Sequence, residues 1–331
     1  MSNTPLRLGV IGPGVIFRRI LSDLGRATGL KLTAIGSRDL ERAQQVAADC
    51  GAEFAYGSYQ ELAQSPHVDV VYIATPHNFH MEEALMCMEA GKHVICEKPM
   101  ALNVDQTRAM IDCAKKNNVF LMEAMWSRCF PASAKLRELL ADKAIGEAWH
   151  FTADFSFSTQ FDPNSRLFSK DLAGGALLDV GIYPMSMAVM AMGADVESFW
   201  GNCVMAPSGV DQMSELIFKY KTGATAHMYC GTCAISPQTM HILGSEGRIE
   251  VPNFWHPEQI IIYDKRNHQT DDLQFPKENE GHWHQFQHVA DCINQGIIDS
   301  PIMPLSETLM MSRIMTELRQ QFGIQYPEEE A

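Results

Sequence analysis

The sequence lacks several features that would assign it to other classes of protein. It has no long Ser-, Gly- or Pro-rich tract and no block of like charges, so no disordered tail is indicated. It has no uninterrupted apolar run of membrane-spanning length, and its first ten residues run into a strand pattern without the apolar segment of a signal peptide. We therefore expect a folded, cytoplasmic protein without a membrane partner.

Positive charge is also scarce. The chain has 26 Lys and Arg against 40 Asp and Glu, a formal net charge of -14. No cluster of Lys and Arg alternates with aromatic residues to offset that charge locally, and an acidic protein repels a phosphate backbone. We expect no nucleic-acid partner.

The sequence offers little for disulfides or metal. Its nine cysteines are an odd number and are scattered, which is typical of buried thiols in a reducing compartment. Cys230 and Cys233 form a CxxC pair, but their segment reads as a strand, in which they would point to opposite faces unless Gly231 breaks it. His284 and His288 are four apart on a predicted helix, without an HExxH pattern or a cysteine ligand. We expect no metal.

The length of 331 residues suits two domains, and the first 124 residues have one consistent pattern. Apolar runs without alternation lie at residues 6–11, 31–36, 68–74, 93–96 and 119–122. Amphipathic helical patterns begin between them, near residues 15, 40, 79 and 104. Fully apolar strands separated by helices predict an α/β Rossmann domain, a doubly wound parallel sheet, over residues 1–124.

The pattern changes over residues 125–331. Alternating apolar and polar residues predict strands at 149–157, 216–220, 225–229 and 260–263. Helices are predicted near 131–141, 181–191, 282–294 and 306–321. We expect an α+β substrate-binding domain with a large, mostly antiparallel sheet, and its last helix, 306–321, is a candidate to pack back on the first domain.

The turn after the first strand predicts dinucleotide binding. Gly12 and Gly14 permit a tight turn, and the helix that follows at Val15 and Ile16 would offer backbone N–H groups to a pyrophosphate. The third glycine of the usual fingerprint is replaced by Phe17. A GxG in the first strand-to-helix turn of a doubly wound pattern still favours a cofactor site over an ordinary tight turn.

The end of the second strand bears on the choice of cofactor. Ser37 stands where NAD enzymes have an acidic residue for the ribose 2′-OH, and Arg38 follows it. A hydroxyl and a guanidinium suit a 2′-phosphate, so we favour NADP over NAD. The alternative is that Ser37 or Asp39 merely caps the next helix and that Arg38 is solvated.

Two further loops are expected at the same edge of the sheet. Thr75, Pro76 and His77 follow the fourth predicted strand and should lie near the cofactor, while His80 suits an ordinary helix position equally well. Glu97 and Lys98 follow the fifth strand, where a nicotinamide should lie. A lysine there could place positive charge beside the reacting oxygen and help to move its proton.

A third motif spans residues 174–184. If it opens a helix, Asp179 and Tyr183 are four apart and share one face. A phenol with its reference pKa of about 10 is a poor base at neutral pH, and a nearby ammonium group would favour the phenolate. The alternative is that Asp179 caps the helix and Tyr183 packs beneath it.

Together these motifs resemble the Gfo/Idh/MocA oxidoreductase family. The resemblance rests on Gly12-x-Gly14, on residues 97–99 (Glu-Lys-Pro) and on residues 175–183 with Asp179 at the centre. It extends to the C-terminus, where residues 304–326 look like the family's last helix and its Gly-x-x-Tyr-Pro ending. Tyrosine rather than histidine at position 183 is more similar to the branch containing trans-dihydrodiol dehydrogenases and NADP-dependent D-xylose dehydrogenases.

The resemblance implies hydride transfer between nicotinamide and a secondary alcohol or carbonyl of a cyclic diol or sugar. Lys98 and Tyr183 would be the acid/base pair, with either as the proton acceptor, and Asp179 would orient the substrate. The resemblance also implies a homodimer. Two alternatives are a non-catalytic sensor of NADP or sugar, and a lyase or hydrolase that uses tightly bound NAD(P) for transient oxidation.

Several aromatic residues and one arginine are candidates for the substrate pocket. Trp126, Arg128, Phe161 and Trp255, with Phe168 as a weaker candidate, could enclose a ring and reach its hydroxyl groups. Aromatic residues are more often part of a core than of a pocket.

Overall fold

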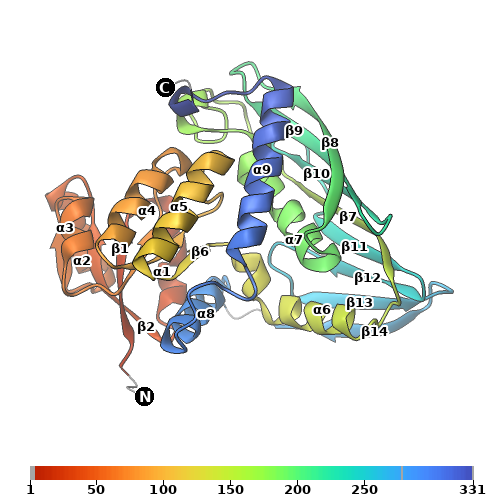
Figure 1. The fold of residues 1–331 in the computed structure, drawn as a ribbon, viewed down its shortest axis with the longest axis horizontal. Helices are drawn as coiled ribbons and strands as arrows, with labels where there is room; N and C mark the ends of the chain where they lie inside the picture. Colours follow the sequence, from red (N-terminus) through yellow and green to blue (C-terminus); the bar gives the residue numbers. More distant parts are fainter. Residues whose placement is uncertain (1–3, 277–278, 330–331) are drawn as a thin grey trace. The chain divides into compact units, whose positions relative to one another are not determined.

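The chain forms two compact units, and the computed structural model describes residues 4–276 and 279–329 (Figure 1). The first unit comprises residues 1–126 and 278–309, and the second comprises residues 127–277 and 310–331. Residues 278–309, which the sequence pattern placed with the second domain, cluster with the first unit. Helix α9 (Leu305–Phe322) begins in the first unit and continues in the second.

Six parallel strands form the sheet of the first unit, in the order β3-β2-β1-β4-β5-β6. The predicted doubly wound Rossmann domain is confirmed. Its strands are β1 (Leu6–Ile11), β2 (Leu30–Gly36), β3 (Phe54–Tyr56), β4 (Val70–Ile73), β5 (His93–Cys96) and β6 (Leu121–Glu123).

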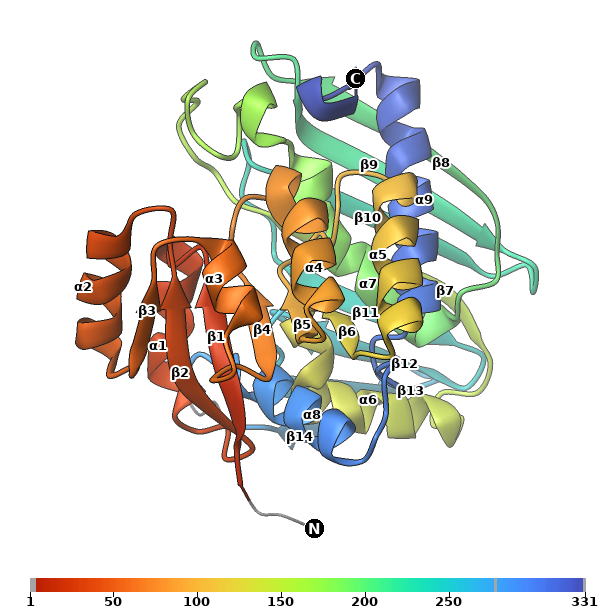
Figure 2. The same cartoon turned by 60° about the vertical axis from the view of Figure 1, so that its left-hand side comes forward.

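Helices cover both faces of this sheet (Figure 2). They are α1 (Val15–Leu24), α2 (Leu40–Cys50), α3 (Tyr59–Gln64), α4 (His80–Glu89), α5 (Val104–Asn117) and α8 (Trp283–Asn294). The buried side chains of α3, α4 and α5 form one core with those of the strands. Helix α8 packs against α1 and β2, and its Phe286 ring meets Tyr72 of β4 edge-on at 5.3 Å. The returning segment therefore completes the core of the Rossmann unit.

Eight strands form the sheet of the second unit, in the order β14-β13-β12-β11-β7-β10-β9-β8. All neighbours are antiparallel except β7 and β10, which confirms the mostly antiparallel sheet. Its strands are β7 (Ala148–Ser156), β8 (Val196–Met205), β9 (Asp211–Tyr220), β10 (Thr225–Gly231), β11 (Thr239–Gly244), β12 (Gly247–Pro252), β13 (Gln259–Asp264) and β14 (Gln269–Gln274).

Helices α6 (Pro131–Ala141) and α7 (Ile182–Met192) and the second half of α9 pack on one face of this sheet. By length and composition residues Lys170–Met192 could cross a membrane, but 83% of their most apolar stretch is buried inside the fold, as in the core helix of a folded domain. The side chains of the opposite face of the sheet, among them Trp200, His227 and His241, are half-buried or exposed.

The C-terminal segment fastens the start of the motif at residues 174–184. Tyr326 is buried, and its hydroxyl donates to the carbonyl oxygen of Gly174 at 2.6 Å. The guanidinium of Arg319 lies 4.7 Å from the centre of the Tyr326 ring and donates two hydrogen bonds of 2.8 Å to Glu329. The end of the chain therefore holds the turn before α7.

We expect Tyr326→Phe to lower the free energy of unfolding by about 1–3 kcal/mol, because the buried Gly174 carbonyl loses its donor. Urea unfolding followed by circular dichroism measures the change. Tyr263→Phe, which keeps its ring 3.4 Å under Arg248, is the matched control and should change stability by less than about 0.5 kcal/mol. Equal effects of the two substitutions would contradict this role of Tyr326.

Candidate active site

The glycine turn after β1 has the geometry that a dinucleotide requires. Gly12 has φ +72°, and a Cβ atom there would lie 2.5 Å from Thr75 Cγ2 and 2.8 Å from Thr75 N. A side chain at this position would be strained and would collide with the next loop. A Cβ atom on Gly14, which precedes α1, would meet only the Gly12 carbonyl at 3.7 Å, so the space before the helix is open.

The first turn of α1 is available to an anion. It contains no acidic residue, and Val15 is 88% exposed while Ile16 is half-buried. Phe17, in the place of the third glycine of the usual fingerprint, is fully buried in the core. The residues present therefore fit a pyrophosphate bound at a helix N-terminus, despite the incomplete fingerprint.

The segment after β2 combines a helix cap with two cationic side chains. Asp39 caps α2 by accepting from Arg42 N at 3.2 Å, and Ser37 Oγ accepts from Asp39 N at 3.3 Å. Arg38 is exposed. Arg42 donates to Pro13 O of the glycine turn at 3.5 Å. Asp39 therefore caps α2, as one of the two alternatives from the sequence stated. Arg38 does not take part in the cap and is accessible to a 2′-phosphate.

The loop after β4 is joined to the loop after β5 by His80. This histidine is fully buried, with Nε2 2.9 Å from Thr75 O and Nδ1 3.0 Å from Pro99 O. Burial lowers the pKa of His80, and Lys98 lowers it further. A neutral imidazole donates to only one of two carbonyls, so the two contacts favour the charged ring while burial opposes it. Burial is the larger influence, because the His80 side chain is fully buried.

The other predicted residues of these two loops are placed as follows. Pro76 precedes the short helix η1 (His77–Phe79), and His77 is buried. Glu97 accepts a short hydrogen bond from the Tyr72 hydroxyl, and its second carboxylate oxygen accepts from Lys98 N at 3.3 Å. The Lys98–Pro99 peptide bond is cis. The hydrogen bonds of Glu97 on one side and the contact of Pro99 O with His80 on the other hold the backbone from which Lys98 extends.

The motif at residues 174–184 forms a π-helical turn, η4 (Leu177–Gly181), and α7 follows it at Ile182–Met192, close to the helix that the sequence predicts at 181–191. Asp179 lies in this turn and is paired with Arg166, whose Nη1 and Nη2 lie 2.6 and 3.2 Å from the two carboxylate oxygens. Single π-helical turns inside helices often occur at functional sites.

A buried carboxyl group positions this turn. Asp211 accepts from Leu177 N and from Ser214 Oγ, both at 2.7 Å, and burial raises its pKa. Its Oδ1 has no hydrogen-bond partner among the described residues, and a Cβ atom on Gly175 would lie 2.4 Å from it. Only glycine fits at position 175, which also has φ +130°.

Tyr183 lies in a cluster of aromatic rings within the second unit. Its ring meets Phe155 edge-on at 5.2 Å, and Phe155 stacks on Trp255 at 5.1 Å. Trp255 donates from Nε1 to Gln238 Oε1 at 2.9 Å. Tyr183 and Trp255, both predicted from the sequence, thus share one neighbour.

For Trp126 and Phe161, two other residues predicted to bind the substrate, the ring contacts are with residues other than Tyr183. Trp126 is buried in the first unit and stacks on His282 at 3.8 Å. Phe161 is partly exposed and contacts Phe168 edge-on at 5.1 Å.

Arg128 is fully buried and donates to the hydroxyl and the carbonyl of Ser186 at 2.8 and 2.6 Å. Ser186 is in α7, three residues after Tyr183. This environment favours a positioning role for Arg128 over the substrate contact that the sequence predicts.

Two residues were missed by the sequence analysis. Arg42 lies in the first turn of α2, four residues after Arg38, and a second arginine so soon after the predicted strand was the signal that could have found it. Arg166 lies in a loop with no periodic pattern, and only the fold pairs it with Asp179. In the described part of the chain no three His, Cys, Asp or Glu side chains are arranged to hold a metal ion.

Two family models match the chain. Residues 6–125 match a model described as "Oxidoreductase family, NAD-binding Rossmann fold", and residues 133–250 match the "GFO/IDH/MocA C-terminal domain". The resemblance inferred from the motifs is confirmed over most of the chain.

Known proteins are similar along nearly the whole length. Trans-1,2-dihydrobenzene-1,2-diol dehydrogenase of Xenopus laevis is 38% identical over 90% of this chain and 91% of its own, and the human protein of that name is 33% identical over 98% and 99%. The 3-ketoreductase KijD10 of Actinomadura kijaniata, solved with NADP and TDP-benzene, is 26% identical with a TM-score of 0.84 over 96% and 98%. Together with the family models, these findings support an NADP-dependent oxidoreductase.

We expect Arg38→Ala to weaken NADPH binding about tenfold or more and NADH binding less than about twofold, because a charge-assisted contact to the 2′-phosphate is lost. Fluorescence titration of each coenzyme measures the dissociation constants. Arg108→Ala, an exposed arginine paired with Asp105 on α5, is the control. An equal loss for both coenzymes would remove the 2′-phosphate assignment.

Proposed function

Because the chain belongs to the Gfo/Idh/MocA family of oxidoreductases, we propose that it interconverts a secondary alcohol and a carbonyl of a cyclic diol or sugar. Bound NADP supplies the hydride acceptor or donor at the nicotinamide. The relatives that are 33–38% identical carry the name of a dihydrodiol dehydrogenase, which favours a trans-dihydrodiol over an aldose.

The observation that carries this proposal is the chemistry around Tyr183. Phe155 meets its ring edge-on and Trp255 stacks on Phe155, so the two supply flat apolar surface. Asp179, on the same motif, and its partner Arg166 supply polar groups. A ring that bears vicinal hydroxyl groups needs both kinds of surface.

Two side chains, Tyr183 and Lys98, can accept or donate the proton of the substrate hydroxyl. We assign the transfer to Tyr183, a phenol held at the start of α7, and we assign Lys98 to the stabilisation of negative charge on the reacting oxygen. Asp179 is held by Arg166 and orients the substrate hydroxyls. Arg128, through Ser186, and Asp211, through Leu177 N, position the helix that carries Tyr183.

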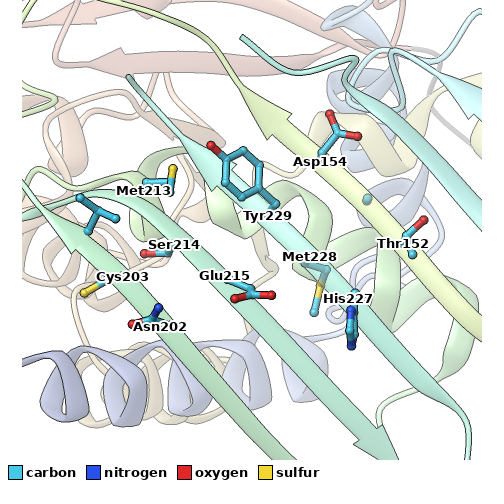
Figure 3. A pocket seen from close by; sticks show the side chains of 12 residues that line it. Thr152, Asp154, Asn202, Cys203, Met213, Ser214, Glu215, His227, Met228 and Tyr229 are labelled. Atoms are coloured by element: carbon cyan, nitrogen blue, oxygen red, sulfur yellow. The ribbon is translucent and has the colours of Figure 1, made fainter. Parts of the chain in front are cut away.

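We also propose a homodimer that forms through the open face of the eight-stranded sheet. Trp200, Val204 and Leu243 on this face are 52%, 43% and 37% exposed. Figure 3 shows a hollow across β7–β10 on which polar side chains, including Glu215, converge. A face that mixes large apolar and polar groups can pair with its own copy about a two-fold axis.

We propose a cytoplasmic location because the cysteines form no disulfide bonds. All nine cysteines are free. Cys230 is buried in β10, and the exposed Cys233 lies beyond the end of that strand at Gly231. An unpaired set of this size suits a reducing compartment.

We expect Tyr183→Phe to lower kcat at least about 100-fold with little change in coenzyme affinity, because the proton-transferring hydroxyl is removed. Nicotinamide absorbance is followed with NADP and a panel of trans-dihydrodiols, aldoses and inositols. Tyr263→Phe is the control and should keep full turnover.

Unchanged turnover in Tyr183→Phe would show that Tyr183 does not transfer the proton. If the wild-type protein turns over none of the panel and yet binds NADP tightly, the sensor reading is favoured. NADP that stays bound through purification would point to transient oxidation within a lyase or hydrolase reaction.

We expect Trp200→Glu to convert the dimer to a monomer, because each copy would place an acidic side chain in the interface where an exposed tryptophan now stands. Light scattering after size-exclusion chromatography measures the mass. Ile235→Glu changes another highly exposed apolar side chain, outside the strands, and should leave the dimer intact. A Trp200→Glu protein that remains dimeric would place the interface elsewhere.

A further inference from the structure

Gln238 links the central strands of the second unit to the indole ring of Trp255. It directly precedes β11, whose register on β7 places Met240 opposite Ala153. Two residues further along, Gln238 therefore reaches the level of Phe155. Its side-chain oxygen Oε1 accepts the 2.9 Å hydrogen bond from Trp255 Nε1. The residue that holds the indole thus stands at the level of the ring on which the indole stacks.

The backbone of Gln238 is held by β7 in an uncommon conformation. Its φ is +58°, in the left-handed region that residues other than glycine seldom adopt. Gln238 N donates to Asp154 Oδ1 at 2.6 Å, and Gln238 Nε2 donates to Ser156 O at 3.1 Å. Such a conformation persists where the surrounding contacts determine it, and residues of this kind cluster at functional sites.

These contacts of Gln238 join the two faces of the sheet. Asp154 lines the hollow on the open face, as Figure 3 shows. Successive side chains of a strand point to opposite faces, so Phe155 points to the helix-covered face, where its ring meets Tyr183 of α7. The backbone of Gln238 is therefore held on the open face, while its side-chain oxygen holds Trp255 on the other.

Trp255 is held at its backbone as well. Ser127 Oγ donates to Trp255 O at 2.6 Å, and Ser127 is fully buried. The plane of the indole lies within 13° of that of the Phe155 ring. Trp255 is half-buried, so part of its apolar surface remains open to a ligand. Hydrogen bonds at both ends of the residue therefore fix the plane of an apolar wall.

We propose that Gln238 is a positioning residue that holds the indole of Trp255 as a flat wall for the substrate ring. The inference rests on the proposed function and narrows its substrate class to rings with a planar, unsaturated part, in preference to puckered saturated rings. A planar ring gains most from stacking on an aromatic surface whose orientation is fixed. Gln238 acts through Trp255 and takes no part in the proton transfer by Tyr183.

The first test compares Gln238→Met with the wild-type protein. Methionine keeps the length of the side chain but offers only a weak sulfur acceptor to the indole N–H, so the ring loses its fixed plane. With NADP we expect KM for trans-1,2-dihydrobenzene-1,2-diol to rise about fivefold, while kcat changes less than about twofold because Tyr183 is untouched.

A saturated analogue tests the substrate class. Trans-cyclohexane-1,2-diol carries the same two hydroxyl groups on a puckered ring, and its inhibition constant against the dihydrodiol is measured with both proteins. We expect this constant to change less than about twofold in Gln238→Met, because a puckered ring gains little from the fixed indole. An equal rise of both constants would overturn the assigned preference.

Gln259→Met is the matched control, because Gln259 is also half-buried and donates from Nε2, in its case to Asp272 of β14. Its constants should equal those of the wild-type protein. Trp255→Phe removes the N–H group that Gln238 binds, so adding Gln238→Met to it should raise KM no further. Effects of the two substitutions that add would overturn the proposal.

A second test observes the indole of Trp255 directly. The protein is labelled with 15N at its five tryptophans, and Trp255→Phe identifies the Nε1–H signal of Trp255 by NMR. This signal should shift in Gln238→Met, and in the wild-type protein it should move when the dihydrodiol is added. A signal that stays in place in either experiment, while the diol is turned over, would overturn the inference alone. Absence of turnover of any diol by the wild-type protein would instead count against the proposed function.

Discussion

The close packing of Gly12 against Thr75 determines where the first unit can bind a dinucleotide. Strands β1 and β4 are neighbours, with Ile11 opposite Ile73, so the two following loops emerge at the same level of the sheet. They fit only because position 12 has no side chain. Helix α4 then secures Thr75 twice, through His80 at its carbonyl and through Glu83 at its hydroxyl. The same His80 contacts Pro99 O, so the cofactor loop and the loop of Lys98 share one support.

In the second unit, too, a glycine and buried hydrogen bonds fix the backbone of the predicted site. Gly175 makes room for the buried Asp211, which holds Leu177 N, and Tyr326 holds the Gly174 carbonyl. A backbone fixed in this way can keep the π-helical turn that carries Asp179, whose geometry is less favourable than that of an α-helix. Both predicted halves of the catalytic set thus start from backbone that is held by buried hydrogen bonds.

The parallel sheet could be predicted from the sequence because its strands are apolar along their whole length. Strands β1 and β5 were placed to the residue, whereas β3 and α3 are short and half-buried and were missed. In the second unit β8 was missed because its alternating side chains include polar ones on both faces.

The site was predicted less evenly. Motif spacing predicts Gly12, Lys98 and Asp179 as site residues, but the pairing of Asp179 with Arg166 depends on a loop without a periodic pattern. The burial of Arg128 against α7 could not be predicted from the sequence either. An arginine that donates to a helix carbonyl, as Arg128 does to Ser186 O, leaves no pattern in the sequence.

The acidity of the chain makes the local charges at the cofactor edge decisive. A net charge of -14 disfavours an anionic coenzyme at long range, but in physiological salt such interactions fade beyond about 8 Å. The charge that matters at the glycine turn is therefore that of a group packed against it, such as Arg42, which donates to Pro13 O.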